Sequence, residues 1–312
     1  MSEPWRNFRY PSKKVSWVKR DVLLFALSVG VKADDIHLLF ESHENFQVLP
    51  SYPIVLSQKG CNHDLVDFYA EFTNSNAGIA IPGVPKLDVK RMVDGGRTMI
   101  FLKPIPVTSL NRDFELQMKL ADVQDKGKPG TVLQTETELI DTHSGEAYVR
   151  IINNNFYLGQ GGWGGPRGSK APNYKHPERR PDLTYDLVTT PETALLYRLN
   201  GDSNPLHAIP GPGRAMGFDG AIIHGLWTYN AALYALLRIL GKSQASSVRR
   251  FEAKFASPLS PGDAARMEIW RLRVFDNDGY EEIRFIVRST GGKLILSNGR
   301  ALIKTGAVSM KL

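Results

Sequence analysis

The chain has 312 residues, of which 42% are hydrophobic and 23% are charged. These values exclude a disordered protein and allow either two domains of ordinary size or one large domain with a full core. The net charge is +7, from 39 Lys and Arg against 32 Asp and Glu, and the basic residues are scattered, at most in pairs such as Lys13 and Lys14. This spread fits a solvated basic surface or a small phosphorylated ligand better than a nucleic acid, so we expect no nucleic-acid partner.

The N-terminal segment and the cysteine content bear on the cellular compartment. The first 17 residues have no apolar core of the kind that a secretory signal needs, and no later run approaches the roughly 20 apolar residues that span a bilayer. A single cysteine, Cys61, excludes an intramolecular disulfide and a thiolate metal cluster. We therefore expect a soluble intracellular protein with no membrane insertion.

The first half of the chain predicts one helix followed by strands. A helix is expected over residues 20–30, ending at Gly30. Alternating apolar and polar residues predict strands, and glycine-rich turns are expected between them. The expected strands are 98–107, 113–123 and 131–141, and the expected turns are 125–130 and 143–146.

A segment rich in glycine and proline separates the two halves. Residues 159–182 contain six Gly and four Pro, and residues 159–164 satisfy the pattern G-x-G-x-x-G. A dinucleotide-binding loop needs a helix that begins within this pattern, and Pro166 with the glycines that follow argues against one. The segment is therefore interpreted as a linker. The expected division is a first repeat over 1–160, a linker over 161–181 and a second repeat over 182–312.

The second half predicts a similar sheet and a longer helix. Residues 225–241 have apolar side chains on almost every side, which predicts a helix buried inside the sheet. Short loops between consecutive strands indicate antiparallel sheets, and the absence of strand–helix–strand alternation argues against a Rossmann or barrel fold. The expected strands are 251–259, 265–276, 280–289 and 293–304, with a hairpin turn at 276–279.

The candidate chemistry lies just before the long helix. In the stretch YRLNGDSNPLH, residues 197–207, Pro205 prevents a helix, so Asp202, Asn204 and His207 must share a stiff, non-helical turn. His224 and Gly225 open the long helix, where free backbone N–H groups can hold a developing oxyanion. A general base beside an oxyanion site suits proton transfer next to a thioester carbonyl. Two structural readings stay open: a turn capped by Asp202, and a hydrogen-bonded core histidine at 207.

YRLNGDSNPLH and FDGAIIHGLWTY, residues 218–229, resemble the signature of the type 2, (R)-specific enoyl-CoA hydratases of the MaoC-like family. That family includes the hydratase portion of peroxisomal multifunctional enzymes and stand-alone fungal-type peroxisomal dehydratases. The first half resembles the non-catalytic repeat of the same proteins. The resemblance implies an α+β double hot-dog fold, in which each of two repeats is an antiparallel sheet wrapped round a helix, and it implies a homodimer.

The resemblance also implies a mechanism. Asp202 and His207 would activate a water that adds to C3 of a trans-2-enoyl-CoA, giving a (3R)-hydroxyacyl-CoA, and the same pair would dehydrate in reverse. Asn204 would hold the turn, and the Gly225 N–H would stabilise the enolate oxygen. No metal or other cofactor is expected, since CoA is part of the acyl-CoA thioester substrate.

Further residues are implied less directly. Positions that match substrate contacts of the family are Asp94, Gly95, Lys126, Ser203, Pro205, Leu206 and Phe255, and expected supporting residues are Tyr197, Asp182 and His224. The chain departs from the family where His-Gly-Glu-Gln is replaced by Asp-Gly-Gly-Arg, residues 94–97. A shorter or interrupted helix around residues 51–68 would leave a tunnel for medium, long or branched acyl chains.

Three other functions are compatible with a hot-dog fold. The alternatives are a hot-dog thioesterase, a dehydratase acting on carrier-protein-bound acyl groups, and a basic acyl-CoA-binding module without turnover. Thioesterases of this fold usually rely on a carboxylate without the Asp-x-Asn-Pro-Leu-His array, which argues against the first alternative. A binding module without turnover does not need catalytic side chains, so the presence of Asp202, Asn204, His207 and Gly225 together argues against the last. The chain ends in Met310, Lys311 and Leu312, similar to a Ser-Lys-Leu signal, so we expect a peroxisomal protein, or otherwise a cytoplasmic one.

Overall fold

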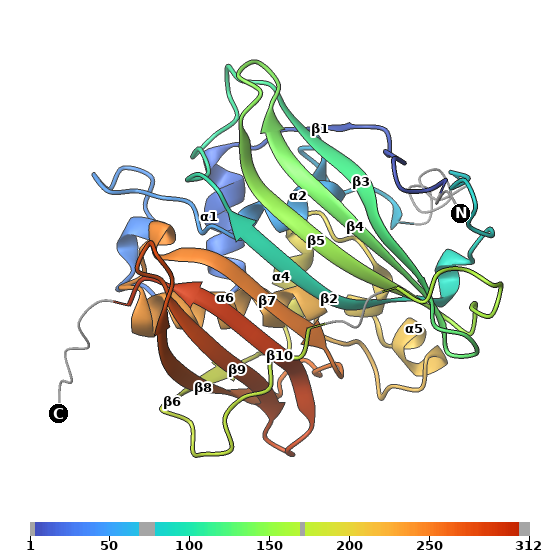
Figure 1. The fold of residues 1–312 in the computed structure, drawn as a ribbon. Coiled ribbons are helices and arrows are strands. Elements are labelled where there is room, and N and C mark those ends of the chain that lie inside the picture. Colours follow the sequence, from blue (N-terminus) through green and yellow to red (C-terminus); the bar gives the residue numbers. More distant parts are fainter. Residues whose placement is uncertain (1–3, 69–78, 169–171, 306–312) are drawn as a thin grey trace.

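A computed structural model of the chain describes residues 4–68, 79–168 and 172–305, and its dominant feature is one ten-stranded antiparallel sheet (Figure 1). The strand order is β1-β3-β4-β5-β2-β7-β10-β9-β8-β6. The first half of the chain supplies β1 Lys13–Val15, β2 Met92–Phe101, β3 Phe114–Asp125, β4 Gly130–Asp141 and β5 Ala147–Leu158. The second half supplies β6 Leu183–Val188, β7 Val248–Phe255, β8 Ala264–Phe275, β9 Glu281–Ser289 and β10 Leu294–Ile303.

The helices lie on the concave side of this sheet (Figure 1). The longest is α6, Gly225–Leu240, and twelve of its residues are buried. The shorter helices are α1 Lys19–Ser28, α2 Leu56–Lys59, α4 Thr193–Tyr197 and α5 Pro210–Ala215. A 3-10 turn, Tyr52–Val55, runs directly into α2, so the first-half helix near residues 51–68 is short and interrupted, as expected.

The double hot-dog fold is confirmed, since each half supplies an antiparallel sheet curved round helices. The two sheets are in fact continuous, because β2 pairs with β7 from Arg97 opposite Ala253 to Ile100 opposite Arg250. The strand expected over 98–107 is wrong in its bounds. It begins at Met92 and ends at Phe101, because Pro104 and Pro106 cannot donate to a ladder.

Three strands were not predicted at all. They are β1, β5 and β6, and β5 was missed because Asn153, Asn154 and Asn155 interrupt its alternating pattern with a residue that strands disfavour. The boundaries proposed for the repeats and the linker stay predictions. The strands are consistent with them, since β5 ends at Leu158 and β6 begins at Leu183.

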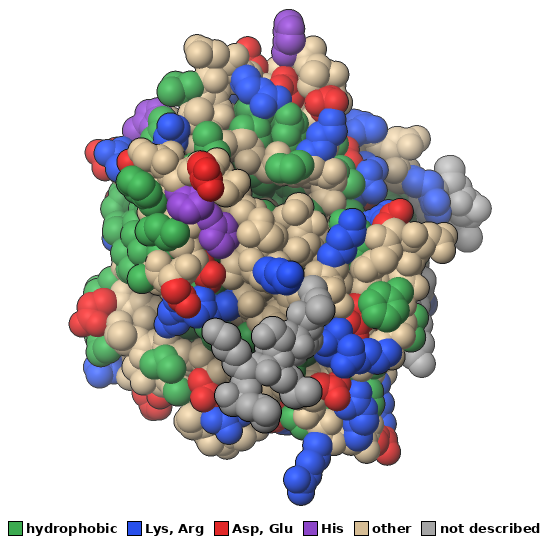
Figure 2. All heavy atoms as spheres, turned by 90° about the vertical axis from the view of Figure 1, so that its left-hand side faces the viewer, with side chains coloured by type: hydrophobic (Ala, Val, Ile, Leu, Met, Phe, Trp, Pro, Cys, Tyr) green, Lys and Arg blue, Asp and Glu red, His purple; other side chains and the backbone are tan. Residues whose placement is uncertain are grey.

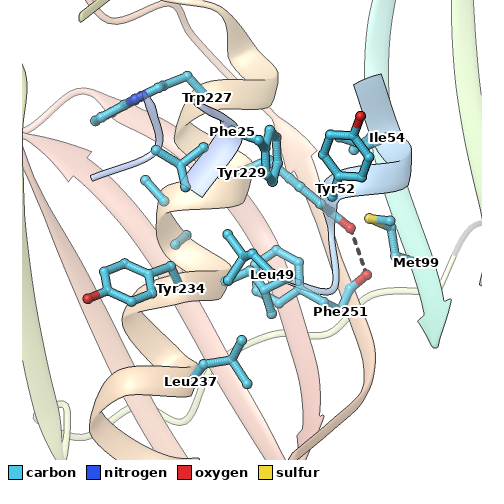
Figure 3. Close-up of a cluster of buried hydrophobic side chains, with 14 of the residues drawn as sticks. Phe25, Leu49, Tyr52, Ile54, Met99, Trp227, Tyr229, Tyr234, Leu237 and Phe251 are labelled. Atoms are coloured by element: carbon cyan, nitrogen blue, oxygen red, sulfur yellow. Dashed lines mark hydrogen bonds between the residues drawn. The ribbon is translucent and has the colours of Figure 1, made fainter. Parts of the chain in front are cut away.

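A large hydrophobic core joins the two halves (Figure 3). Trp227, Tyr229 and Tyr234 project from α6, while Phe25 and Tyr52 reach the same cluster from the first half. The Tyr229 hydroxyl donates a hydrogen bond of 2.8 Å to the carbonyl of Phe251 in β7, so its polar end is satisfied inside the core. The helix is therefore held by the sheet of its own repeat and by the helices of the other.

Polar contacts fix α6 against the first half at two further points. The Trp227 indole donates to the carbonyl of Ser28 at 2.8 Å. Near the other end, the Arg238 guanidinium forms ion pairs with Asp34 and Asp35 at 2.6 and 2.5 Å. The first of these contacts adjoins the start of α6, where the candidate site lies.

The surface charges are mixed, and the helices are short. Figure 2 shows Lys and Arg side chains spread over one face of the molecule, with acidic side chains among them. This distribution has no continuous basic stripe on the face shown, in agreement with the scattered charges of the sequence. Among the described residues, none of the helices combines the length and apolar character needed to cross a bilayer.

The first part of the glycine-rich segment wraps round a buried carboxylate. Asp125 accepts hydrogen bonds from the backbone N–H groups of Gly127, Gly162, Gly164 and Gly165, at 2.6 to 3.2 Å. A Cβ at Gly161 would lie 2.2 Å from the carbonyl oxygen of Gly127, so no other residue fits there. No helix begins within residues 159–168. The G-x-G-x-x-G pattern therefore serves the protein's own carboxylate.

We expect Asp125→Asn to lower the free energy of unfolding at pH 7. Both carboxylate oxygens accept hydrogen bonds from backbone N–H groups, and an amide would replace one of these acceptors by an NH₂ group, which only donates. The N–H of Gly162, with those of Gly127, Gly165 and Gly164, lowers the pKa of Asp125 from 3.8. A carboxyl whose pKa is lower in the folded state stabilises the fold at pH values above its unfolded-state pKa, and this stabilisation is lost as the pH falls through its folded-state pKa. The free energies of unfolding of the variant and the wild type, measured with urea, should therefore differ most at pH 7, and the difference should shrink below pH 3.8.

Asp122→Asn is the matched control, since Asp122 lies on the same strand and its carboxylate accepts hydrogen bonds from the Val123 N–H and the Gln124 amide, with no other hydrogen-bond partner among the described residues. An equal loss of stability in both variants would contradict the role assigned to Asp125.

Candidate active site

The turn expected to carry the chemistry begins where α4 ends. After Tyr197, a 3-10 turn over Arg198–Asn200 leads to Gly201, whose φ is +113°. A Cβ at Gly201 would lie 2.7 Å from the backbone nitrogen of Lys59 in α2. Only glycine fits this conformation and this close approach, so the chain reverses here and rests on the first repeat.

Two side chains then build the turn itself. The Asp202 carboxylate accepts a hydrogen bond of 3.2 Å from the N–H of Asn204. The Asn204 side chain accepts one of 3.0 Å from the N–H of Leu206, capping the 3-10 turn Pro205–His207. Proline suits the first position of such a turn because its φ is preset and it has no N–H to satisfy. The spacing of Asp202, Asn204 and His207 thus follows from the capping geometry.

His207 has a defined tautomer. Its Nδ1 lies 2.8 Å from the carbonyl oxygen of Ile222. A carbonyl only accepts, so Nδ1 carries the proton and Nε2 is left with a free lone pair when the ring is neutral. Burial lowers the pKa of His207, and the charge of Asp202 and the bond to Ile222 oppose that shift. His207 is therefore a neutral base near pH 7.

His224 lies directly against His207. The two rings are stacked, with centroids 3.7 Å apart, and His224 Nε2 lies 3.8 Å from an Asp202 oxygen. Its other neighbour is the Tyr197 ring, 4.9 Å away. The His224 side chain is buried and neither of its ring nitrogens has a hydrogen-bond partner among the described residues. Burial, followed by the charges of His207 and Arg198, holds its pKa well below the usual range, so the ring stays neutral.

The N-terminus of α6 adjoins this pair. His224 is the N-cap and Gly225 is the first helical residue, so the N–H groups of the first turn point out of the helix without intrahelical partners. Gly225 is exposed, and a Cβ at this position would lie 3.1 Å from the Phe255 ring. The glycine leaves its N–H accessible, and Phe255 bounds one side of the approach.

The structure brings most of the expected residues together. Asp202, Ser203, Asn204, Pro205, Leu206 and His207 share the turn, while Tyr197, His224, Gly225 and Phe255 adjoin it. Their roles in substrate binding stay predictions.

Two expected residues make their contacts elsewhere. Asp182 binds the Arg179 guanidinium and the N–H of Arg271 at the outer edge of the sheet. Lys126, in the β3–β4 turn, donates to the carbonyl of Arg167 at 3.2 Å. Neither contacts a member of the Asp202, His207 and His224 cluster. The carbonyl of Ile222, which sets the tautomer of His207, was missed because a backbone oxygen has no sequence signal.

Asp94 and Gly95 lie on β2, at an irregularity in its pairing with β5. The Asp94 carboxylate forms an ion pair of 2.6 Å with Arg97. Arg97 is not among the predicted site residues, although the sequence signal is present: it stands where the family pattern has Gln.

The cluster of Asp202, His207 and His224 has the composition of a metal site, since potential ligand atoms of the three lie within 4.8 Å of one another. The stacking of the two rings is an argument against a shared metal ion. The planes of the two imidazole rings differ by only 25°, so their nitrogen lone pairs run side by side and do not converge on one point. The arrangement suits proton transfer at the free Nε2 of His207, beside the Asp202 carboxylate.

Comparison with known proteins gives consistent relationships. Residues 172–290 match the MaoC like domain and residues 16–159 match the MFE-2 hydratase 2 N-terminal domain. A protein of Ajellomyces capsulatus named probable dehydratase is 43% identical over 310 residues, a match covering 95% of this chain and 81% of that protein. A probable enoyl-CoA hydratase 2 of Dictyostelium discoideum is 28% identical over 301 residues, covering 96% and 95%.

Solved structures show the same fold. A MaoC-like dehydratase from Phytophthora capsici superimposes with a TM-score of 0.84 at 24% identity, over 98% of this chain and 99% of that one.

The electrostatics of the imidazole pair predict how His207 titrates. We expect the pKa of His207 to lie below 6.5 because burial disfavours the charged ring. Asp202→Asn should lower that pKa further, since the carboxylate opposes the effect of burial. Measuring the Cε1–H chemical shift of His207 by NMR across pH tests both statements. Asp219→Asn should leave the titration unchanged, because Asp219 is exposed and its carboxylate has no hydrogen-bond partner within the described ranges, where its backbone carbonyl accepts from Arg214. A higher pKa in Asp202→Asn would contradict the assignment.

Proposed function

Because this chain belongs to the family of MaoC-like dehydratases, we propose that it is an (R)-specific enoyl-CoA hydratase that also catalyses the reverse dehydration. It is a hydro-lyase whose substrate is an acyl-CoA thioester. One observation carries the proposal: the Asp202 carboxylate and the neutral His207 ring share one capped turn beside the N-terminus of α6. A general base, a carboxylate that can hold the reacting water and an oxyanion donor are thereby assembled within one small region.

The proton transfers follow from the tautomer of His207. A water held between Asp202 and His207 Nε2 loses a proton to that nitrogen while its oxygen forms the bond to C3 of the trans-2-enoyl thioester. The electrons of the C2–C3 double bond move toward the thioester carbonyl, forming an enolate. The imidazolium then returns the proton to C2. One hydroxyl and one hydrogen have been added, which balances the water consumed, and the steps run in reverse for dehydration.

The enolate oxygen is the place where charge develops. The Gly225 N–H, at the positive end of the α6 dipole, is suited to stabilise it. Any larger residue at position 225 would press on the Phe255 ring, because its Cβ would lie 3.1 Å from that ring, and would move the helix N-terminus. Oxyanion donors of this kind typically contribute about 2.7–4 kcal/mol to transition-state stabilisation.

His224 supports the base without reacting itself. Its neutral ring covers one face of His207 and excludes water from that side. By covering His207, this ring helps to bury it, and burial lowers the pKa of His207, so the base is unprotonated near neutral pH, where a general base works best. We propose that no metal or other cofactor takes part, in keeping with the side-by-side lone pairs of the two rings. The homodimer stays a prediction.

Single substitutions in the turn should separate chemistry from binding. Asp202→Asn and His207→Gln should each reduce hydration of a trans-2-enoyl-CoA by at least about 10², the usual contribution of one acid–base group. Because both residues act on one water, the double variant should lose far less than the product of the single losses. Loss of absorbance of the conjugated enoyl thioester measures the rate.

The control variant is Asp219→Asn, which lies on the surface near the turn and should keep its activity. A thiol reagent in the same assay reports free CoA, so release of thiol in place of hydration would identify a thioesterase. If Asp202→Asn stays active while Asp219→Asn does not, the assignment is wrong.

We propose a peroxisomal location. The support is the C-terminal Met310, Lys311 and Leu312, which lie outside the described residues. A fluorescent protein fused to the N-terminus should give peroxisomal puncta in a fungal cell, and deleting these three residues should disperse the signal through the cytoplasm. An unchanged distribution after the deletion would refute this location signal.

A further inference from the structure

The concave face of the first-repeat sheet carries polar side chains between two apolar clusters. Cross-strand pairing places Thr135 of β4, Asn153 of β5 and Arg97 of β2 in one row, and Asn155 with Asp94 in the next. We call these five residues the polar band. On one side of it are Met99, Leu139 and Val149 of the main core. On the other side are Leu133 and Tyr157 of a second cluster that also contains Trp5, Leu120 and Val123.

The direction of these side chains follows from the strand alternation. Met99 faces the core beside Tyr52 (Figure 3), and Arg97 is two residues before it on the same strand, hence on the same face. Thr98 faces the other way, where its hydroxyl meets Glu252 at 3.2 Å. Asp94 and Arg97 are three residues apart and would normally face opposite sides. The β-bulge between Asp94 and Gly96 turns both inward.

The Gly95–Gly96 pair makes this bulge sterically feasible. A Cβ at Gly95 would lie 3.0 Å from the carbonyl oxygen of Asn154, and one at Gly96 would lie 2.9 Å from that of Ala253. The sequence Asp-Gly-Gly-Arg, where the family pattern has His-Gly-Glu-Gln, therefore supplies the bulge and the two charged residues together.

Hydrogen bonds join four members of the band, Asp94, Arg97, Asn153 and Thr135, into one network. Arg97 binds the Asp94 carboxylate at 2.6 Å and also donates to the Asn153 side-chain oxygen, and the Asn153 amide donates to Thr135 at 3.1 Å. The Arg97 Nε–H is buried and has no partner among the described residues. An unpaired buried donor is unfavourable unless a ligand or water accepts its hydrogen bond.

The band is continuous with the catalytic region. Arg97 pairs with Ala253, and Phe255 is two residues further along β7 on the same face, against Gly225. Burial raises the pKa of the Tyr197 hydroxyl, and the charge of Arg97 is one of the influences that oppose this. The Tyr197 ring itself lies against His224, with ring centroids 4.9 Å apart. A chain that leaves the catalytic turn past Phe255 therefore meets the polar band.

We propose that the acyl chain taken by this enzyme carries a neutral oxygen function, a hydroxyl or a carbonyl, that binds at the Arg97, Asn153 and Asp94 network. The inference rests on the proposed function and specifies its substrate class. A plain alkyl chain leaves the Arg97 donor unpaired, whereas a hydroxyl or carbonyl accepts from it. A carboxylate suits the site less, because Asp94 already balances the charge of Arg97. Sites built to hydrogen-bond a substrate group discriminate strongly against analogues that lack it.

The first test compares substrates with the wild-type enzyme. trans-2-Decenoyl-CoA and a series of its hydroxylated isomers, with the hydroxyl moved stepwise along the chain, are assayed for kcat/KM. At least one hydroxylated isomer should exceed the plain substrate by about tenfold, the value of one hydrogen bond to a charged donor. Hydration of the plain chain as efficiently as every isomer would overturn the inference and leave the proposed function intact. If no enoyl-CoA is hydrated at all, both are overturned.

The second test changes the network as a unit. The double variant Asp94→Asn with Arg97→Met removes the ion pair without leaving a buried carboxylate unpaired. It should lower kcat/KM for the preferred isomer by about tenfold and leave the plain substrate within about twofold. Arg150→Gln is the matched control, since Arg150 lies on the opposite face of β5, paired with Glu136 and Glu138, and should change neither.

Equal losses on both substrates would show that the pair is structural and would overturn the inference. The substrate comparison needs no variant, so a double variant that fails to fold leaves the inference open to refutation.

Discussion

The burial of α6 is the constraint on which the rest of the structure depends. Twelve residues of this helix are buried, and its apolar surface runs almost all round, so no single sheet face can cover it. Its own repeat supplies β6, β7 and β10, and the first repeat supplies α1 together with the Asp34 and Asp35 carboxylates. The first repeat is thus part of the enclosure of α6, and the pairing of β2 with β7 closes the sheet around both.

That enclosure also explains the state of the reactive groups. The N-terminus of α6 is held in place by the Trp227 bond to Ser28, so His224 is fixed in a fully buried position with no solvent to charge it. The His224 ring stacks on His207 and helps to bury it, and this burial lowers the pKa of His207, while the Ile222 carbonyl selects its tautomer. A buried imidazole pair that titrates below its usual range is a typical arrangement for a base that must be unprotonated near neutrality.

The two repeats have come to use the same sheet geometry differently. In the second repeat the concave face is filled by α6, and the candidate active site lies at the N-terminus of this helix and in the turn before it. In the first repeat the helix is replaced by a short 3-10 turn and α2, Leu56–Lys59, and the concave face carries the polar band. This face differs from an ordinary apolar core by a bulge of two glycines and by an Arg97 donor that has no partner in the part of the chain that the structure describes.

Local patterns in the sequence determined the antiparallel strands, the buried helix at 225–240 and the turn with Asp202, Asn204 and His207, because each follows from short-range periodicity, capping or the stiffness of proline. Segments distant in the chain determine the bounds of β2, the existence of β5 and the contacts of Asp182. The same holds for the stacking of His224 on His207, the bond from His207 to Ile222 and the inward turn of Asp94 and Arg97. The tertiary structure alone decided these, since pairing register and ring contacts arise when segments far apart in sequence meet.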